Sequence, residues 1–156
     1  MRVDFYHLTT RPLDRVLPPI VERVLGAGER LLIVADEEQQ RIALDTLLWT
    51  YAADSFLAHG LAGAGDEGAQ PVLIAGTVAP ANGARHVALV DGRWRDEVLD
   101  GAGLDGAPPV FERAFHFFDE ERIREARLAW KALGGRDGIE RNYWQQKNEG
   151  GWRKQA

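Results

Sequence analysis

Cysteine is absent from this sequence, and serine occurs once, at Ser55. Without cysteine the chain cannot form disulfide bonds, thiolate metal sites, iron–sulfur clusters or a cysteine nucleophile. Ser55 stands in Asp-Ser-Phe, which lacks the flanking glycines of a nucleophile elbow. The four histidines are too far apart in sequence to place two metal ligands on one helix face. We therefore expect no metal, no cofactor and no catalytic residues.

Long hydrophobic runs and an excess of positive charge are also missing. No apolar run approaches the roughly 20 residues that a membrane-spanning helix needs, and the N-terminus has no secretory signal pattern. We expect a soluble, unprocessed cytoplasmic protein without a membrane partner. The formal net charge of −5 argues against strong direct binding of nucleic acid through its phosphates, although local basic patches are compatible with it.

The chain has 156 residues and 45% hydrophobic content, which is enough for one core. We expect a single domain over 1–156, with an aromatic C-terminal tail from about residue 134. Apolar runs predict strands over 3–6, 30–35, 72–75, 86–90 and 110–117. Helical periodicity predicts a helix running towards Gly26, a helix over 37–51 and a helix over 119–133. A threonine or Asp14 can cap the first of these helices, and Asp119 can cap the last.

This alternation of strands and helices predicts an α/β fold. Nearly continuous apolar strands such as 30–35 are typical of parallel sheets that are covered on both faces. The expected architecture is three-layered, with a mainly parallel sheet flanked by helices.

The alternative function is that of a nucleotide-binding enzyme on such a scaffold, and two sequence features bear on it. The stretch Gly63–Gly68 matches G-x-G-x-x-G, but it leads through Pro71 into a strand, and its acidic residues would repel phosphate. We interpret it as a surface loop. Asp36 could hold a ribose hydroxyl, but without a glycine-rich first turn it is more simply a helix cap.

The expected helix over 119–133 carries an apolar face with a basic stripe beside it. The apolar face consists of Ile123, Ala126, Trp130 and Leu133, and the stripe of Arg124, Arg127 and Lys131. One interpretation is a core face with a solvated basic edge. The other is a pocket for an acidic peptide that ends in an apolar residue, in which Arg127 grips a carboxylate and Trp130 forms an apolar wall.

Two further groups of aromatic residues are compatible with core packing or with an interface. Trp49 ends the second helix and Phe56 begins the turn after it. The C-terminal residues Tyr143, Trp144 and Trp152 are too aromatic for a disordered tail, so this segment either packs on the domain or contributes to a partner surface. Direct binding of single-stranded DNA by the tail is a third functional hypothesis, which the acidic net charge disfavours.

Several short segments, in their order and spacing, together resemble the chi subunit family of DNA polymerase III. They are Asp4-Phe-Tyr-His, Leu44-Asp-x-x-Leu-Trp49, Ser55-Phe-Leu-x-His59, Ala126-Arg-x-x-Trp-Lys-Ala132, Asn142-Tyr-Trp-Gln-Gln and Gly150-Gly-Trp-x-Lys154. The resemblance extends over essentially the whole chain. It implies a Rossmann-like fold without known nucleotide chemistry, and a non-catalytic accessory subunit that acts in DNA replication.

The resemblance also implies two partners. One surface would bind the acidic, phenylalanine-ended tail of single-stranded DNA-binding protein through Arg124, Arg127, Trp130 and Lys131, with Arg127 on the terminal carboxylate and Trp130 in the phenylalanine pocket. Another, with Trp49 and Phe56, would bind the clamp-loader subunit psi or an iron–sulfur helicase.

Two positions depart from the family pattern. Gly134 stands where a basic residue is usual, so we expect Arg136 to replace it, and Ala58 stands where proline is common.

Overall fold

The computed structural model describes residues 1–51, 57–100 and 111–156. Eight strands within these ranges form one sheet. They are β1 (Arg2–His7), β2 (Leu31–Val34), β3 (Gly60–Leu61), β4 (Val72–Ala75), β5 (His86–Leu89), β6 (Arg113–Phe118), β7 (Glu140–Gln146) and β8 (Trp152–Lys154). Their order across the sheet is β3-β4-β2-β5-β6-β1-β7-β8. All neighbouring strands are parallel except β7 and β8.

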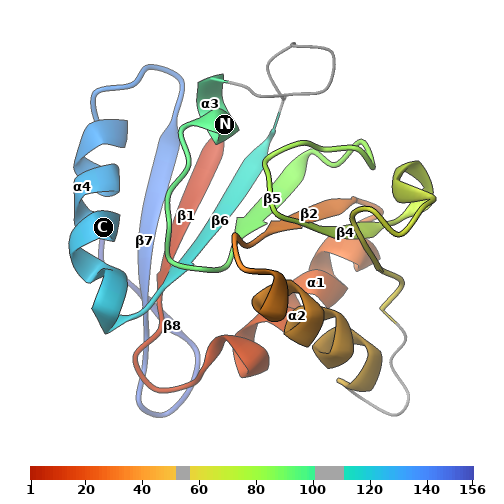
Figure 1. The fold of residues 1–156 in the computed structure, drawn as a ribbon. Coiled ribbons are helices and arrows are strands. Elements are labelled where there is room, and N and C mark those ends of the chain that lie inside the picture. Colours follow the sequence, from red (N-terminus) through yellow and green to blue (C-terminus); the bar gives the residue numbers. More distant parts are fainter. Residues whose placement is uncertain (52–56, 101–110) are drawn as a thin grey trace.

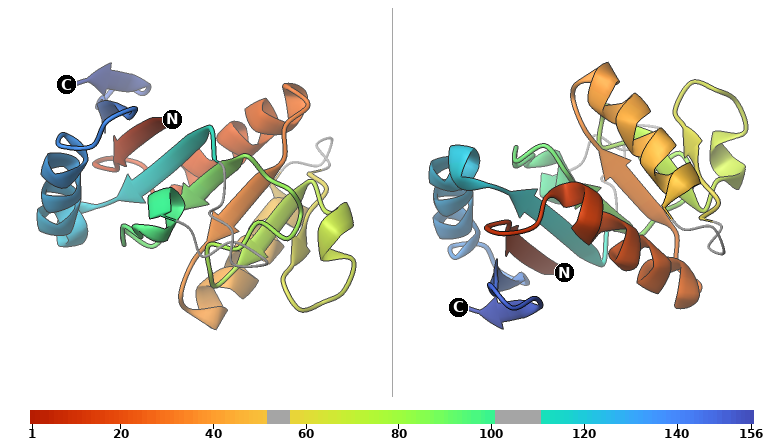
Figure 2. Two further views of the ribbon diagram at one scale, coloured as in Figure 1. Left: turned by 90° about the horizontal axis from the view of Figure 1, so that it is seen from above. Right: turned by 90° about the horizontal axis from the view of Figure 1, so that it is seen from below.

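Helices cover both faces of this sheet (Figures 1 and 2). The helical elements are α1 (Leu13–Gly26), α2 (Glu38–Thr50), α3 (Glu97–Asp100), α4 (Ile123–Leu133) and the 3-10 turns η1 (Glu67–Ala69) and η3 (Glu120–Arg122). Residues of α1 and α2 belong to one hydrophobic cluster and residues of α4 to the other. The expected three-layer α/β fold with a mainly parallel sheet is confirmed. Within the described residues, no helix has the length and apolar character needed to span a bilayer.

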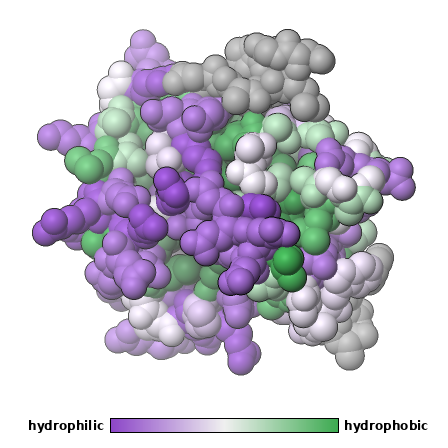
Figure 3. Space-filling model, in the orientation of Figure 1, coloured by the Kyte–Doolittle hydropathy of each residue, from purple (hydrophilic) through white to green (hydrophobic). Residues whose placement is uncertain are grey.

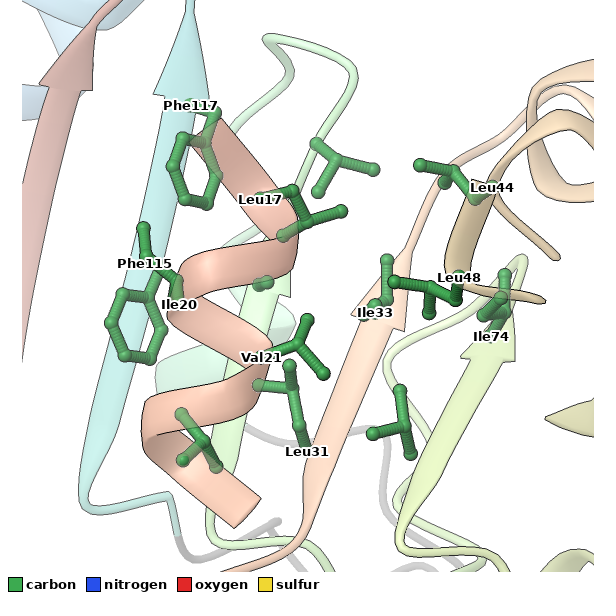
Figure 4. Close-up of a cluster of buried hydrophobic side chains, with 14 of the residues drawn as sticks. Leu17, Ile20, Val21, Leu31, Ile33, Leu44, Leu48, Ile74, Phe115 and Phe117 are labelled. Carbon is green, nitrogen blue, oxygen red and sulfur yellow. The ribbon is translucent and has the colours of Figure 1, made fainter. Parts of the chain in front are cut away.

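The α1 and α2 face of the sheet holds one of the two hydrophobic cores (Figure 4). Leu17, Ile20 and Val21 of α1 pack towards β2 and β6, while Leu44 and Leu48 of α2 pack towards β2 and β4. Each central strand sends alternate side chains to this core, because successive residues of a strand point to opposite faces. All four residues of β2 are buried, as expected for a strand that helices cover on both sides.

The first helix begins differently from its sequence-based expectation. It starts at Leu13, directly after Pro12, and no side chain caps its N-terminus. The fixed backbone angle of proline suits the residue that precedes a first helical turn. The helix ends at Gly26 as expected, but the proposed capping role of Asp14 is wrong.

The C-terminal segment forms part of the sheet. β7 lies parallel to β1, with Val3 opposite Arg141 and Phe5 opposite Tyr143. β8 then returns antiparallel to the end of β7. Of the two interpretations of this segment, the structure shows packing against the rest of the fold.

A buried carboxylate joins the strand β7 to its neighbours. Asp4 of β1 is fully buried and accepts hydrogen bonds from Arg113 Nε at 2.7 Å, Asn142 Nδ2 at 3.0 Å and Trp144 Nε1 at 3.1 Å. The guanidinium of Arg2 lies 3.0 Å from it as well. A buried charge is tolerated only when it is paired and hydrogen-bonded, so this network favours the observed order of β6, β1 and β7.

Candidate functional site

A capped turn positions α4 after the end of β6. The Asp119 carboxylate accepts a hydrogen bond from the backbone N–H of Glu121 at 3.0 Å, which satisfies one of the free donors at a helical N-terminus. The turn η3 follows and continues into α4. The expected cap is therefore present, one turn before the α-helix itself.

The two expected faces of α4 are also present. Ala126, Ala129 and Leu133 are buried in the core between α4 and the sheet, and the alanines allow the helix backbone to lie close to the strands. Arg124, Arg127 and Lys131 are exposed. Leu128 lies on the exposed side as well, with 70% of its surface accessible. In Figure 3 the surface over α4, at the left, is largely hydrophilic.

Trp130 lies at the boundary between these two faces. It is half-buried, and its ring meets those of Phe5 and Tyr143 edge to face, with centroids 5.4 Å and 5.5 Å apart. The Arg141 guanidinium lies 4.2 Å from the Trp130 ring centroid and donates to the Trp130 backbone carbonyl. The indole is therefore held in place by β1 and β7 and leaves part of its surface accessible beside the cations.

Arg127 is linked to β7 through Tyr143. The Arg127 guanidinium lies close enough to the Tyr143 phenol to affect its ionisation. Burial raises the pKa of Tyr143 above its ordinary value, and the nearby Arg127 charge opposes that increase. Arg127 and Trp130 thus both lie beside Tyr143, so two of the four expected site residues of α4 are brought together.

Sequence reasoning missed the contribution of Arg141. A Cβ atom at Gly134 would lie 2.8 Å from Arg141 Nη2, so the glycine leaves the space that this guanidinium occupies. The cation closest to the position of the missing family residue therefore comes from β7. Arg136 is exposed nearby in sequence, and its expected role as the replacement remains a prediction.

The second expected surface is described only in part. Trp49 lies at the end of α2 with 55% of its surface exposed, and Ile42 on the same helix is 49% exposed. Residues 42, 46 and 49 share one face of a helix. The Trp49 ring contacts that of His59, with centroids 4.8 Å apart. Phe56 lies outside the described residues, so the structure does not relate it to Trp49.

The carboxyl ends of the parallel strands, where α/β proteins commonly bind ligands, border a cavity of about 630 Å³. Its lining includes the acidic residues Asp36, Glu37, Asp91, Asp119 and Glu121, and the basic residues Arg11, Arg93 and Arg122. Acidic groups outnumber basic ones, an arrangement that disfavours a phosphate-bearing ligand.

Asp36 at this edge does not cap α2, contrary to expectation. Its carboxylate contacts Arg93 at 2.6 Å and Arg95 at 2.7 Å, and no side chain caps the helix at Glu37. Burial alone would raise the pKa of Asp91 beside it, but hydrogen bonds from Arg95 and the backbone lower that pKa below its ordinary value. The arginines are therefore engaged with carboxylates of the chain itself.

The glycine-rich stretch from Gly63 to Gly68 is a surface turn. It follows the two-residue strand β3, which sequence reasoning did not predict, and leads through η1 into β4. The Glu67 carboxylate accepts a hydrogen bond from the Gly63 backbone N–H. No helix of useful length follows the glycines, so the geometry of a dinucleotide-binding turn is not formed here.

Taken together, the sheet and its helices define a Rossmann-like α/β protein that carries a cationic and aromatic surface on α4. Residues 1–139 match the protein family described as DNA polymerase III chi subunit, HolC. The chain belongs to this family.

A curated protein with a name from the same family matches a shorter stretch of the chain. A segment of 49 residues is 47% identical to DNA polymerase III subunit chi of Escherichia coli (strain K12). The aligned segment covers 31% of this chain and 33% of that protein, about a third of the relative's length.

Proposed function

We propose that this protein is a non-catalytic, cytoplasmic accessory subunit of the bacterial DNA polymerase III holoenzyme, and that it connects the clamp-loader complex to the acidic C-terminal tail of single-stranded DNA-binding protein. Family membership supports a role in replication. The observation that carries tail binding is the surface of α4, where the half-buried Trp130 ring lies against the Arg141 guanidinium and the exposed Arg124, Arg127 and Lys131 follow the same helix.

The chemistry of this cluster suits an acidic peptide with an aromatic end. Arg127 lies near Tyr143, and a guanidinium binds a terminal carboxylate through two parallel hydrogen bonds. Trp130 offers an apolar surface to a phenylalanine ring. Arg124 and Lys131, both exposed, would attract the acidic residues that precede the terminal phenylalanine of the tail.

Such capture would act by raising local concentration. A subunit that is anchored in the clamp loader and binds tails on coated DNA keeps the polymerase machinery close to its template. Modest affinity for one tail is sufficient, because many copies of single-stranded DNA-binding protein cover the strand.

The peptide site is tested by titrating a labelled peptide with the acidic, phenylalanine-ended tail sequence into wild type and Arg127→Ala. We expect the substitution to weaken binding at least tenfold, because a hydrogen bond to a charged group contributes about 1.5 to 3 kcal/mol. Fluorescence anisotropy measures the affinity.

Arg85→Ala is the matched control for this titration, because Arg85 is an exposed arginine that pairs with Glu112 on another part of the surface. It should leave affinity unchanged. A peptide without its final phenylalanine should bind weakly to every variant. Equal affinity of wild type and Arg127→Ala would contradict the assignment of this site.

The exposed end of α2 supports a second part of the proposal. Trp49 and Phe56 would bind the clamp-loader subunit psi or an iron–sulfur helicase. The exposed Trp49 ring and the exposed Ile42 on the same helix provide apolar surface of the kind that anchors protein interfaces.

Replacement of Trp49 by alanine tests this second surface. We expect the variant to lose co-purification with psi, or with the helicase where psi is absent, because a central tryptophan in an interface contributes 2 kcal/mol or more. The same variant should bind the acidic peptide as wild type does. Retention of both partners by Trp49→Ala would rule out the surface.

The alternative, a nucleotide-binding enzyme, predicts a different response. Nucleotides with divalent metals would raise the melting temperature if they bound the folded protein. We expect no such shift, because acidic residues predominate at the carboxyl ends of the strands. A clear stabilisation would favour the alternative.

A further inference from the structure

A basic groove lies between α1 and the turn that joins β7 to β8. Arg11, Arg15 and Arg23 line one side of it, and Lys147 and Trp152 line the other. Its volume is about 130 Å³. None of the described residues that line it is acidic, in a chain whose formal net charge is −5.

The arginines and the lysine of this groove differ from six arginines elsewhere in the described residues, which form ion pairs with carboxylates. Elsewhere, arginines form ion pairs, as between Arg113 and Asp4 and between Arg95 and Asp91. In the part of the chain that the structure describes, no carboxylate is paired with Arg11, Arg15, Arg23 or Lys147. Their charge is therefore available to an external anion.

Arg15 and Arg23 lie along α1, and Lys147 lies across the groove from them. Arg15 and Arg23 are eight residues apart on one helix, which separates them by about 12 Å along its axis. Arg11 extends across to the β7–β8 turn, where its Nη2 lies 3.4 Å from the position of a Cβ atom at Gly150. Gly150 has a φ of 98°, a conformation that glycine adopts readily.

The strand β8 adds to the same side of the sheet. Trp152 packs edge to face on Tyr6, with ring centroids 4.9 Å apart, in the core beneath α1. Because strand residues alternate, Lys154 lies on the same face as Trp152. The cations therefore lie along the groove, and the aromatic residue Trp152 forms part of its base. Viewed from below in Figure 2, α1 and β8 are both on the near side of the molecule.

The shape and charge of the groove indicate the class of its ligand. It is smaller than the cavities of about 300 to 1,000 Å³ that hold small molecules, and its cations are spread along a line. An extended polyanion fits this arrangement. An acidic peptide that is held by an apolar terminal residue would need an apolar pocket for that residue. A row of arginines beside an aromatic ring is instead typical of a site that binds a single strand of nucleic acid.

We propose that the groove between α1 and β8 binds single-stranded nucleic acid through its phosphates. The contacts are few, so binding is weak and depends on salt. The site is on the opposite face of the sheet from α4, because Trp152 and Trp130 pack in different core clusters. It is therefore independent of peptide capture, and the two can be tested separately.

The test measures the fluorescence anisotropy of a labelled oligo-dT of about 20 nucleotides as full-length protein is added at low salt. Wild type is compared with Arg15→Ala/Arg23→Ala and with Arg124→Ala/Lys131→Ala, which removes the same charge from α4. We expect the groove variant to bind at least tenfold more weakly and the α4 variant to stay within twofold of wild type. With four phosphate contacts, the slope of log K against log salt should be about −3.

Three outcomes would overturn the proposal. Wild type could show no saturable binding at low salt, or the two double variants could weaken binding equally, which would indicate nonspecific charge alone. The third is that an oligo-glutamate peptide displaces the oligonucleotide at lower concentration and itself depends on Arg15 and Arg23. An acidic peptide would then be the ligand of the groove.

Discussion

At the scale of single residues, His116 is the most unusual titratable group of the core. It is fully buried on β6, with its ring next to those of Phe5 and Trp94. Neither ring nitrogen has a hydrogen-bond partner among the described residues. Burial lowers its pKa from the ordinary 6.5 to about 3, while the Asp91 charge raises it and the Arg95 charge lowers it.

His116 should therefore make stability depend on pH. Below pH 6.5 the unfolded chain binds a proton that the folded state does not accept until about pH 3. Stability present above pH 6.5 is consequently lost as the pH falls, by about 1.4 kcal/mol per pH unit. His116→Phe removes this contribution, so its unfolding free energy should differ between pH 7.5 and 4.5 by about 2.5 kcal/mol less than that of wild type.

Urea denaturation at the two pH values measures this difference. Carboxylates contribute to the pH dependence of both proteins and cancel in the comparison. An identical loss of stability in wild type and His116→Phe would show that the imidazole is not buried in its neutral form.

At the scale of elements, the network around Asp4 joins three strands. Because Asp4 is buried and Arg113 is more than half-buried, removing the carboxylate leaves a poorly solvated guanidinium without its partner. Asp4→Asn should therefore lower the free energy of unfolding by about 3 kcal/mol.

The pair of Arg85 and Glu112 provides the contrast in the same denaturation experiment. Both of its side chains are about half exposed, and exposed pairs contribute about 0 to 1 kcal/mol. Arg85→Ala should change stability by less than 1 kcal/mol. Similar losses in the two variants would mean that the Asp4 network does not stabilise the sheet in the way described.

Elements differ in how well the sequence predicts them. β2 and β4 are buried apolar runs, and they were predicted to within one residue at each end. β7 reads Glu-Arg-Asn-Tyr-Trp-Gln-Gln, without an apolar period, so it was not predicted as a strand. It forms because its amide and indole groups bind Asp4 and its backbone pairs with β1. Asp4 and the other residues of β1 are more than 130 positions away from β7 in the sequence. The residues around β7 alone therefore do not predict this strand.

At the scale of the whole molecule, the net charge is negative, but the cations are concentrated on particular parts of the surface. Arg124, Arg127 and Lys131 gather on α4, and a second group of cations lines the groove beside α1, whereas Arg93, Arg95 and Arg113 are engaged with carboxylates. Local fields of this kind attract anionic partners even on an acidic protein.

Salt should therefore distinguish the two partner surfaces. Raising sodium chloride from about 50 to 200 mM should weaken binding of the acidic peptide several-fold, because the Debye length over which exposed charges interact falls from about 14 Å to about 7 Å. Binding at the apolar Trp49 surface should change little. Isothermal titration of each partner at the two salt concentrations measures this. A peptide affinity that does not respond to salt would contradict a charge-based mechanism at α4.

The sequence by itself determined the α/β class, the central strands, the amphipathic α4 and the cluster of Arg127 and Trp130. These features depend on local periodicity and on residues one or two helical turns apart. Only the tertiary structure decided that β7 lies beside β1, that Arg141 covers Trp130, and that Arg15 and Trp152 line one groove. Each of these contacts joins segments that are distant in sequence, and strand register, which no local pattern encodes, determines which side chains meet.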